Sequence, residues 1–326
     1  MPFWYQSTRW WAWLLFPLAL AMQCISAVRC YAYKKGWLKS YQSPLPVVVV
    51  GNISVGGNGK TPFVISLCEL LIKQGYKPGV VSRGYGGKSG AYPLLVGQDT
   101  IGKEAGDEPV LIYKRLNIPV VVDPVRSNAA TYLAEQCDVD VIITDDGLQH
   151  YALQRDIEIV VVDGKRRYGN QHIMPMGPLR EPVSRLKTVD YIINNGENYV
   201  GEFTMLLLPS ECKRVDGQAD ILTLQSTQSV NACAAIGYPP RFFDTLIKQN
   251  FILQKKIAFA DHHAYTEDDF KQFETTIPLL MTEKDAVKCT GFAQPNWWYL
   301  PIDGQLPDTF TQPFLEKLKQ IKESKC

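Results

Sequence analysis

A glycine-rich turn at residues 54–61, placed between an apolar run and an amphipathic helix, most constrains what this chain can fold into. The preceding segment, 44–52, contains a run of valines that is apolar on both faces, which is typical of a central parallel strand covered by helices. After the turn, Pro62 suits the start of a helix, where its missing N–H would have no partner. Strand, glycine-rich turn and helix in this order predict a phosphate-binding loop.

Each part of this loop has an expected role. Backbone N–H groups of the turn and of the helix start form a cradle for anions. Lys60 is expected to reach the β- and γ-phosphates of a nucleotide, and the Thr61 hydroxyl to ligate Mg²⁺. The common pattern G-x-x-x-x-G-K-[ST] has glycine where this chain has Ser54. The predicted nucleotide site comprises Ser54, Val55, Gly56, Gly57, Asn58, Gly59, Lys60 and Thr61.

Strand-like and helical segments alternate after the loop, which predicts an α/β fold with a parallel sheet. The expected strands of this sheet lie at 79–82, 118–123, 139–145, 157–163 and 191–194. A second series of strands is expected at 231–237, 256–260, 277–281 and 297–300. Between the two series, strand-like pieces at 203–208 and 221–224 flank a polar segment.

These segments predict how the chain is divided into domains. We expect a P-loop NTPase-type parallel sheet domain at 37–201 and a second, smaller α/β domain at 229–326. Residues 202–228 are expected to form a hairpin linker, and residues 1–36 a membrane-associating hydrophobic helix.

Two acidic residues, Asp145 and Asp146, follow the apolar run 139–144. A parallel strand that ends in carboxylates places them at the carboxyl edge of the sheet, beside the phosphate loop. Adjacent carboxylates repel each other, and a bound cation removes that repulsion. The sequence therefore predicts that Asp145 and Asp146 hold Mg²⁺, with an ordinary turn at the strand end as the alternative.

The motifs that define other nucleotide-binding classes are missing from the sequence. The nearest string to the guanine-binding motif N-K-x-D is 282–285, where lysine and aspartate are adjacent. Thr144 stands where the GTPase motif D-x-x-G requires aspartate, and Val55 stands where partitioning-type ATPases carry lysine. A small-molecule kinase that uses ATP remains, and it needs a base and a positioned acceptor.

Polar clusters outside the loop supply candidates for that chemistry. Asp107 precedes a predicted helix, where it can accept a hydroxyl proton or simply cap the helix. His262 and His263 follow an apolar run, and the sequence does not choose between them as partner of a catalytic carboxylate. Arg83 and Arg180 are candidate phosphate clamps because a planar guanidinium pairs with phosphate oxygens, with surface salt bridges as the alternative.

The amino-terminal run 10–28 is uncharged and lies between Arg9 and Arg29. As a helix rising about 1.5 Å per residue, it nearly matches a bilayer core of roughly 30 Å. Its tryptophans gather at one end, as aromatic residues do at membrane interfaces. We predict an anchor that spans the bilayer or lies on it, and a helix packed on the main domain is the alternative. Arg29 directly after the run argues against a cleaved signal peptide.

Taken together, the motifs resemble those of the tetraacyldisaccharide 4′-kinase, or lipid A 4′-kinase, family. The resemblance covers nearly the whole chain, including its hydrophobic amino terminus, and Ser54 matches the family's own variant of the loop. The matching segments occur in the family's order: residues 51–62, Ser82-Arg83-Gly84-Tyr85-Gly86, Gly106-Asp107-Glu108-Pro109, Asp145-Asp146-Gly147-Leu148-Gln149-His150, Gly177-Pro178-Leu179-Arg180-Glu181 and Thr282-Glu283-Lys284-Asp285.

The resemblance implies transfer of the γ-phosphate of ATP to the 4′-hydroxyl of a tetraacyldisaccharide 1-phosphate, giving lipid IVA at the cytoplasmic face of the inner membrane. It implies that Asp107 is the base, paired with His262, and that Arg180 lies near the transferred phosphate. It also implies that Asp145, Asp146 and Glu181 lie near Mg²⁺.

Other partners and functions are constrained by the bulk charge. The formal net charge is +1, so no global field attracts nucleic acid, and no protein partner is evident. The alternative function is that of a membrane-associated P-loop ATPase that acts as a switch or binding module.

Overall fold

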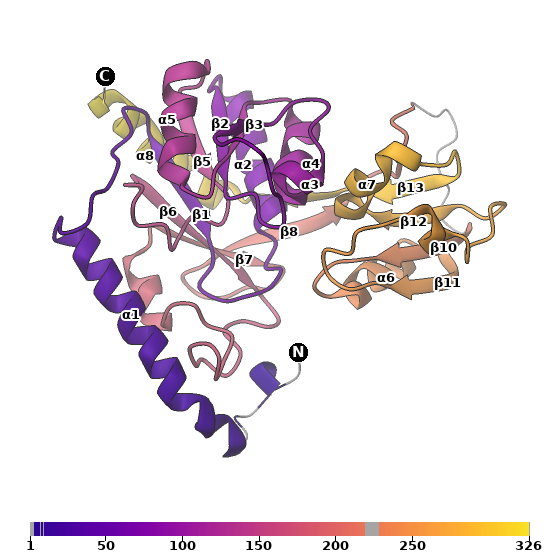
Figure 1. Ribbon diagram of the computed structural model, residues 1–326, viewed down its shortest axis with the longest axis horizontal. Helices are drawn as coiled ribbons and strands as arrows, with labels where there is room; N and C mark the ends of the chain where they lie inside the picture. The colour runs from indigo at the N-terminus through magenta and orange to yellow at the C-terminus, as the bar shows by residue number, and fades with distance from the viewer. Residues whose placement is uncertain (1–2, 7, 9, 219–227, 326) are drawn as a thin grey trace.

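The computed structural model describes residues 3–6, 8, 10–218 and 228–325, and its strands form two separate sheets (Figure 1). The larger sheet has the strand order β14-β8-β7-β6-β1-β5-β2-β4-β3. The smaller has the order β11-β10-β12-β13-β9. The predicted α/β class, with a large parallel sheet and a second, smaller α/β unit, is confirmed.

The larger sheet is parallel at its centre and antiparallel at both edges, where β3 and β14 lie. Its strands are β1 (Val47–Gly51), β2 (Pro78–Ser82), β3 (Leu94–Leu95), β4 (Val120–Val122), β5 (Val141–Thr144), β6 (Ile157–Asp163), β7 (Tyr191–Asn195), β8 (Phe203–Pro209) and β14 (Ile302–Gln305). The predicted strand before the phosphate loop is β1, which pairs with β5 on one side and β6 on the other.

Helices cover both faces of this sheet because successive side chains of a strand point to opposite sides. Val48 and Val50 of β1 face one apolar cluster, which includes α2 (Lys60–Lys73), α4 (Asp107–Leu116) and α8 (Asp308–Lys325). The other face packs against α5 (Arg126–Gln136). A short helix, α3 (Gly102–Ala105), leads directly into α4.

The smaller sheet carries α6 (Pro239–Lys248) and α7 (Glu283–Cys289), with a separate apolar cluster on each of its faces. Its strands are β9 (Lys213–Arg214), β10 (Ser229–Ala234), β11 (Ile252–Ala258), β12 (Leu279–Thr282) and β13 (Trp297–Leu300). Apart from β9, which is antiparallel, the paired strands are parallel.

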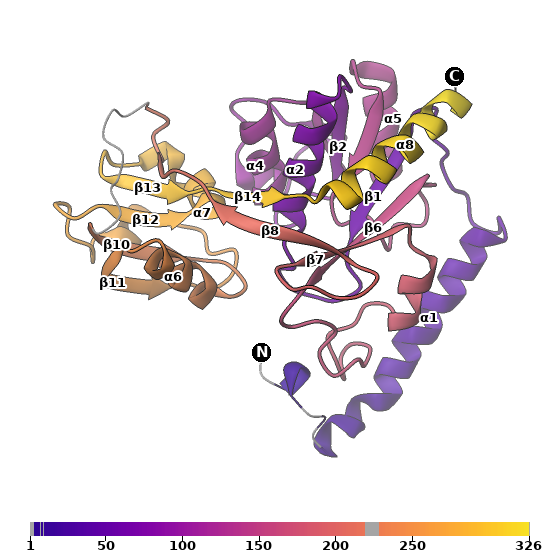
Figure 2. The same ribbon diagram turned by 180° about the vertical axis from the view of Figure 1, so that it is seen from behind.

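Strand β8, in the region of the predicted linker, connects the two sheets. β8 leads into the smaller sheet and pairs antiparallel with β14, which returns from it (Figure 2). The chain after residue 301 therefore belongs with the larger sheet, whereas the sequence analysis placed all of 229–326 in the smaller domain. The physical reason is the apolar stripe of α8, Phe310, Phe314 and Leu318, which is fully buried against the larger sheet. The expected strand at 221–224 lies outside the described residues.

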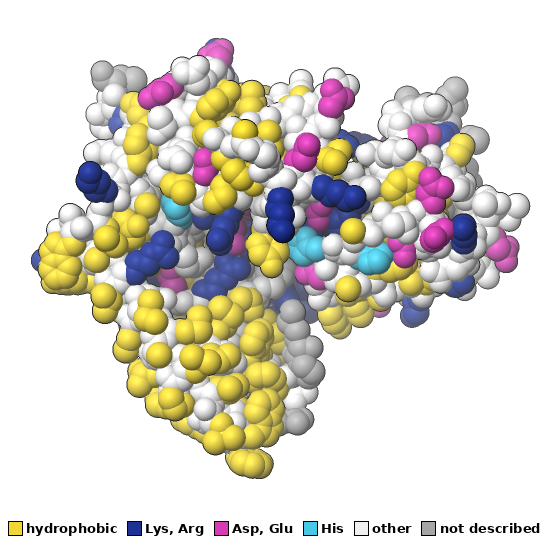
Figure 3. Space-filling model, viewed as in Figure 1, with side chains coloured by type: hydrophobic (Ala, Val, Ile, Leu, Met, Phe, Trp, Pro, Cys, Tyr) yellow, Lys and Arg dark blue, Asp and Glu magenta, His cyan; other side chains and the backbone are white. Residues whose placement is uncertain are grey.

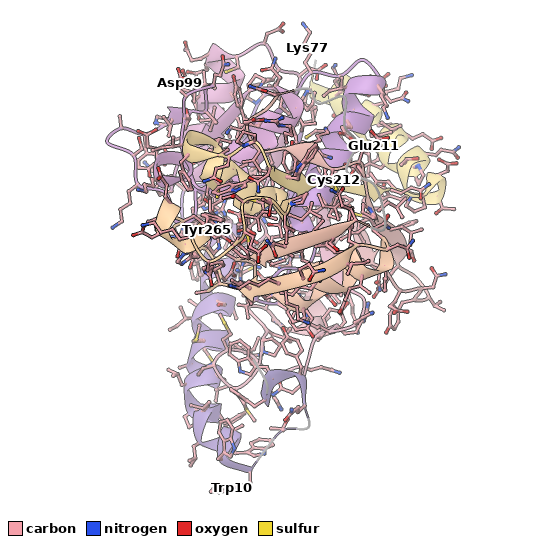
Figure 4. The ribbon with its side chains drawn as sticks, turned by 90° about the vertical axis from the view of Figure 1, so that its right-hand side faces the viewer. Trp10, Lys77, Asp99, Glu211, Cys212 and Tyr265 are labelled. Carbon is pink, nitrogen blue, oxygen red and sulfur yellow. The ribbon has the colours of Figure 1, made fainter. Side chains whose placement is uncertain are left out.

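The amino-terminal segment forms a short 3-10 helix, η2 (Trp10–Leu15), and then α1 (Phe16–Lys34). Trp10–Lys34 is the one helix in the described part of the chain that is long and apolar enough to cross a membrane. Its buried side chains are Ala12, Ala19 and Ala32, and its large apolar side chains are mostly exposed. The segment Trp10–Lys34 forms a projection from the larger domain, which these side chains cover in Figure 3. Trp10 lies at the far tip of this projection in Figure 4.

The packing of α8 generates a stability prediction. Phe314 is fully buried and stacks on Phe310 with ring centroids 5.4 Å apart. We expect Phe314→Ala to lower the free energy of unfolding by about 3 to 5 kcal/mol, because it removes a buried ring and leaves a cavity. Urea denaturation measures the loss. Lys319→Ala, at an exposed position of the same helix, is the matched control, with an expected change within about 0.5 kcal/mol. Equal effects of the two substitutions would contradict the assignment of α8 to the core.

Candidate active site

The phosphate loop begins where β1 ends at the carboxyl edge of the larger sheet. Gly56 and Gly59 have φ values of 106° and 90°, a left-handed conformation that glycine adopts without steric cost. Inside the loop, the buried Asn58 amide donates a hydrogen bond to the hydroxyl of Ser54 over 3.0 Å. A glycine at position 54 could not make this bond, which gives the unusual serine a physical role in closing the loop.

A neighbouring segment, 178–181, is held against the loop by backbone hydrogen bonds. The N–H of Val55 donates to the carbonyl of Pro178 over 2.9 Å, and the N–H of Arg180 donates to the carbonyl of Ile53 over 2.7 Å. These bonds fix the backbone that carries Arg180. The guanidinium of Arg180 then reaches Asp146, with Nη1 and Oδ2 2.9 Å apart.

Asp146 collects the positive charges of the site. The ammonium of Lys60 lies 3.4 Å from Oδ1 of its carboxylate, and Arg180 donates to both carboxylate oxygens. Burial opposes the ionisation of Asp146, but Lys60 and Arg180 outweigh burial and lower the pKa of Asp146 to about 2. Asp146 therefore stays ionised and holds Lys60 and Arg180, two of the predicted site residues, at one place.

Asp145 differs from its neighbour. It is 6% exposed, and its Oδ1 atom is buried with no hydrogen-bond partner. Burial raises the pKa of Asp145 to about 6, although Lys60 acts in the opposite direction. The negative charges of Asp146 and Glu108 raise it further. Glu108 is at the start of α4, where Gly106 packs against Gly84, just past the carboxyl end of β2. A buried carboxylate oxygen without a donor is suited to a cation.

Glu181, the third carboxylate predicted to lie near Mg²⁺, has two contacts of its own. The hydroxyl of Tyr151 donates to its Oε1 over 2.8 Å, and Nε of Arg185 lies 3.2 Å from its Oε2. Within the described residues, no three or more His, Cys, Asp or Glu side chains are grouped closely enough to hold a metal ion. Oε2 of Glu181, like Oδ1 of Asp145, is nevertheless buried without a hydrogen-bond partner. The prediction that Asp145, Asp146 and Glu181 lie near Mg²⁺ therefore stays a prediction.

The predicted base and histidine come together across the two domains. Asp107 is the first residue of α4, and Nδ1 of His262 lies 3.2 Å from its Oδ2. His263 instead contacts Asp269 over 3.1 Å and stacks on Phe259 within the smaller domain. The geometry therefore pairs His262, and not His263, with Asp107.

Helix α7 supplies basic side chains to this region that the sequence analysis missed. Lys284 donates to Glu108 over 2.6 Å, and the ammonium of Lys288 lies 3.4 Å from Asp107. Both lysines lie one turn apart on α7, and their partners are adjacent at the start of α4. The string Thr282-Glu283-Lys284-Asp285 was visible in the sequence, but no local signal connects it to residues more than 170 positions earlier.

Arg166 is a second residue that the sequence analysis missed. Its guanidinium donates to the carbonyl of Gly57 in the phosphate loop and lies 3.1 Å from the buried Asp163 at the end of β6. Arg241 of α6 binds the same carboxylate over 2.5 Å. The loop is thus connected to the smaller domain through Asp163.

The arrangement brings two kinds of group to one edge of the larger sheet. A cradle of backbone N–H groups, with Lys60 and Arg180, can bind phosphate oxygens. A carboxylate held by a histidine, Asp107 with His262, can accept a proton from a hydroxyl. This combination suits phosphoryl transfer to an alcohol.

Comparisons with known proteins agree with this chemistry. A chain named tetraacyldisaccharide 4′-kinase from Psychromonas ingrahamii is 65% identical over 99% of this chain and 100% of its own length. A chain of the same name from Tolumonas auensis is 53% identical over 98% and 97%. A crystal structure of the apo form of LpxK from Aquifex aeolicus in complex with ATP superposes with a TM-score of 0.79, at 29% identity, over 95% of this chain and 99% of that one. The sequence model of the Tetraacyldisaccharide-1-P 4′-kinase family, LpxK, matches residues 11–319, and the chain therefore belongs to this family.

Proposed function

We propose that this chain transfers the γ-phosphate of ATP to the 4′-hydroxyl of tetraacyldisaccharide 1-phosphate, giving lipid IVA in lipid A biosynthesis. Family membership over nearly the whole chain supports this function. The single geometric observation that carries it is the contact of Asp107 with His262 near the phosphate loop. A P-loop ATPase that acts only as a switch or binding module would have no use for this pair.

Asp107 acts as the base in this proposal. Its position as the first residue of α4 favours the negative charge, because the exposed N–H groups of a helix start carry partial positive charge. His262 and Lys288 both lie against Oδ2, at 3.2 and 3.4 Å. These contacts hold the carboxylate in one orientation while a proton is transferred.

Lys60 and Arg180 bind the phosphate groups that the loop cradles. Both are held by Asp146 before any nucleotide arrives, so they need little reorganisation to bind phosphate oxygens. When bound, Mg²⁺ would neutralise charge on the β- and γ-phosphates. The unpartnered Oδ1 of Asp145 and the Thr61 hydroxyl fit this ion, with Asp146 beside them.

We assign Glu181 a supporting role instead of a direct bond to the ion. Its carboxylate holds Tyr151 and Arg185, and its backbone lies against Ile53 at the base of the phosphate loop. Glu181 therefore helps to hold the segment that carries Arg180 in position beside the phosphate loop.

The amino-terminal projection is the proposed membrane contact, at the cytoplasmic face of the inner membrane. Its exposed apolar side chains suit the bilayer, and lysine and arginine side chains adjoin it in Figure 3. A tetraacylated substrate stays in the bilayer, so an enzyme with such a projection meets its acceptor there.

Phosphate transfer tests the proposal. Purified protein with Mg²⁺ and labelled ATP should phosphorylate tetraacyldisaccharide 1-phosphate, and Asp107→Asn should lower kcat by about a hundredfold or more while ATP affinity stays nearly unchanged. Asp269→Asn alters the other Asp–His pair and is the matched control, with kcat close to that of the unaltered protein. ATP turnover that is indifferent to the lipid would favour the switch or binding module instead.

Because Asp145 is buried, we predict that a substitution that removes its charge will stabilise the folded protein. The pKa of Asp145 is raised from 3.8 to about 6, so the folded protein binds this proton more tightly than the unfolded chain does. The resulting cost is absent below pH 3.8, grows between these values and is complete above pH 6. At pH 8 without divalent ions, Asp145→Asn should raise the free energy of unfolding by roughly 2 to 3 kcal/mol and abolish phosphate transfer.

Asp146→Asn is the control of opposite sign for this measurement. Its lowered pKa means that the ionised carboxylate stabilises the folded protein, so the substitution should be destabilising above pH 4. Urea denaturation in the presence of a chelator measures both variants. A loss of stability in both would contradict the assignment of Asp145 as a costly, unpaired charge.

If the apolar projection binds the membrane, polar substitutions on it should weaken membrane binding, whereas the same substitutions elsewhere on the surface should not. Replacing the exposed Leu14, Leu18 and Ile25 with serine should reduce partition into anionic vesicles by about tenfold or more, because each buries apolar surface in the bilayer. The same replacement at Tyr238, Ile247 and Ile252, which are exposed on the smaller domain, is the matched control. Vesicle flotation measures how much of each variant binds the vesicles. Equal binding of the two variants would mean that the membrane contact lies elsewhere on the protein.

A further inference from the structure

The environment of His262 is defined on both sides of its ring. Nδ1 faces Oδ2 of Asp107 at 3.2 Å, and Nε2 faces Nζ of Lys284 at 3.3 Å. A second carboxylate, Asp261, lies 4.0 Å from Nε2, and the ring of Tyr85 lies edge-on at 5.5 Å. His262 therefore stands between a carboxylate acceptor and an ammonium donor that come from different domains.

These two neighbours determine where the ring carries its proton. An ammonium group has donors and no acceptor, so Nε2 must accept the hydrogen bond from Lys284 and cannot carry hydrogen itself. Nδ1 must then be the protonated nitrogen, which donates to the carboxylate of Asp107. The imidazole is neutral in this arrangement, with its hydrogen toward the proposed base.

We propose that Lys284 is a positioning residue that keeps His262 neutral, with its hydrogen on Nδ1, so that His262 orients Asp107 without neutralising it. This inference rests on the proposed function, in which Asp107 is the base. A doubly protonated His262 would form a full ion pair with Asp107 and make the carboxylate a weaker base. By occupying Nε2, Lys284 prevents that second protonation.

Lys284 is itself fixed and charged. Its ammonium donates to Glu108 of α4 over 2.6 Å, and its side chain is largely buried where α7 meets α4. Burial opposes the charge of Lys284, but Glu108 outweighs burial and raises the pKa of Lys284. Without this lysine, the ring would face the carboxylates Asp107, Asp261 and Glu108, and Lys288 would remain on the Asp107 side.

Lys284 has a simpler possible role, which is to join the two domains through its ion pair with Glu108. A neighbouring pair separates the two roles. Arg115 of α4 binds Glu283 of α7 over 2.9 Å, so it joins the same two helices. Neither of its residues contacts His262 among the described interactions. Glu283→Gln is therefore a matched control that weakens the α4–α7 contact and leaves the surroundings of His262 intact.

Nitrogen NMR of histidine-labelled full-length protein without substrate tests the protonation state directly. The signals of His262 are identified because they are missing from the spectrum of His262→Asn. At pH 7, these signals should show a protonated Nδ1 and an unprotonated Nε2. Lys284→Met and Lys284→Gln should both make His262 predominantly doubly protonated, whereas Lys284→Arg and Glu283→Gln should keep it neutral. Thermal unfolding identifies any variant that has lost its fold, and the two charge-removing variants give independent readings.

Kinetics provide the second measurement. Lys284→Met should lower kcat at pH 7 by about tenfold or more with little change in KM for ATP, and the loss should shrink as pH rises and His262 becomes neutral again. Lys284→Arg should restore most of the activity, and Glu283→Gln should show no such pH dependence. A neutral His262 in both charge-removing variants, or a loss that is constant with pH, would overturn the proposal. The NMR result is independent of the reaction, so it stands even if Asp107 is not the base.

Discussion

The contact between α4 and α7 is the interaction on which the active site depends. The proposed base, Asp107, begins α4 of the larger domain, and its histidine partner comes from the smaller domain, so neither domain contains the pair alone. Ion pairs of Lys284 with Glu108 and of Arg115 with Glu283 fix the two helices against each other. These pairs are largely buried, and removing one partner would leave an uncompensated charge, which makes the arrangement specific.

A second constraint is charge balance at the carboxyl edge of the larger sheet. Asp146 is satisfied by Lys60 and Arg180, whereas Asp145 is buried beside them with an unpartnered oxygen. Such a group costs stability in the metal-free protein and is expected where binding, and not folding, selects the residue. The same short segment therefore contains one carboxylate that organises the cations and one that is left available to a ligand.

Local patterns predicted the parts of the fold that depend on local physics. The valine run before residue 52 is apolar on both faces because β1 lies at the centre of the sheet, and the glycines after it mark the loop. The return of β14 and α8 to the larger sheet was missed, since it depends on packing between residues far apart in the chain. The contacts of Glu181 with Tyr151 and Arg185 were not predicted either, since Glu181 lies in an irregular segment where spacing along the chain does not bring side chains together.

The roles of the two domains follow from which groups share a core. Ala12 and Ala19 of the amino-terminal segment pack in the same apolar cluster as Val49 of β1, so the projection and the phosphate loop belong to one continuous core. His262 and Lys284 belong to the smaller domain, whose clusters contain none of these residues. In the proposed function, a lipid acceptor at the projection would be fixed relative to the phosphates, while His262 and Lys284 reach Asp107 through the α4–α7 contact. In the proposed function, proton transfer therefore depends on domain contact, whereas the groups proposed to bind phosphate and the membrane belong to the larger domain.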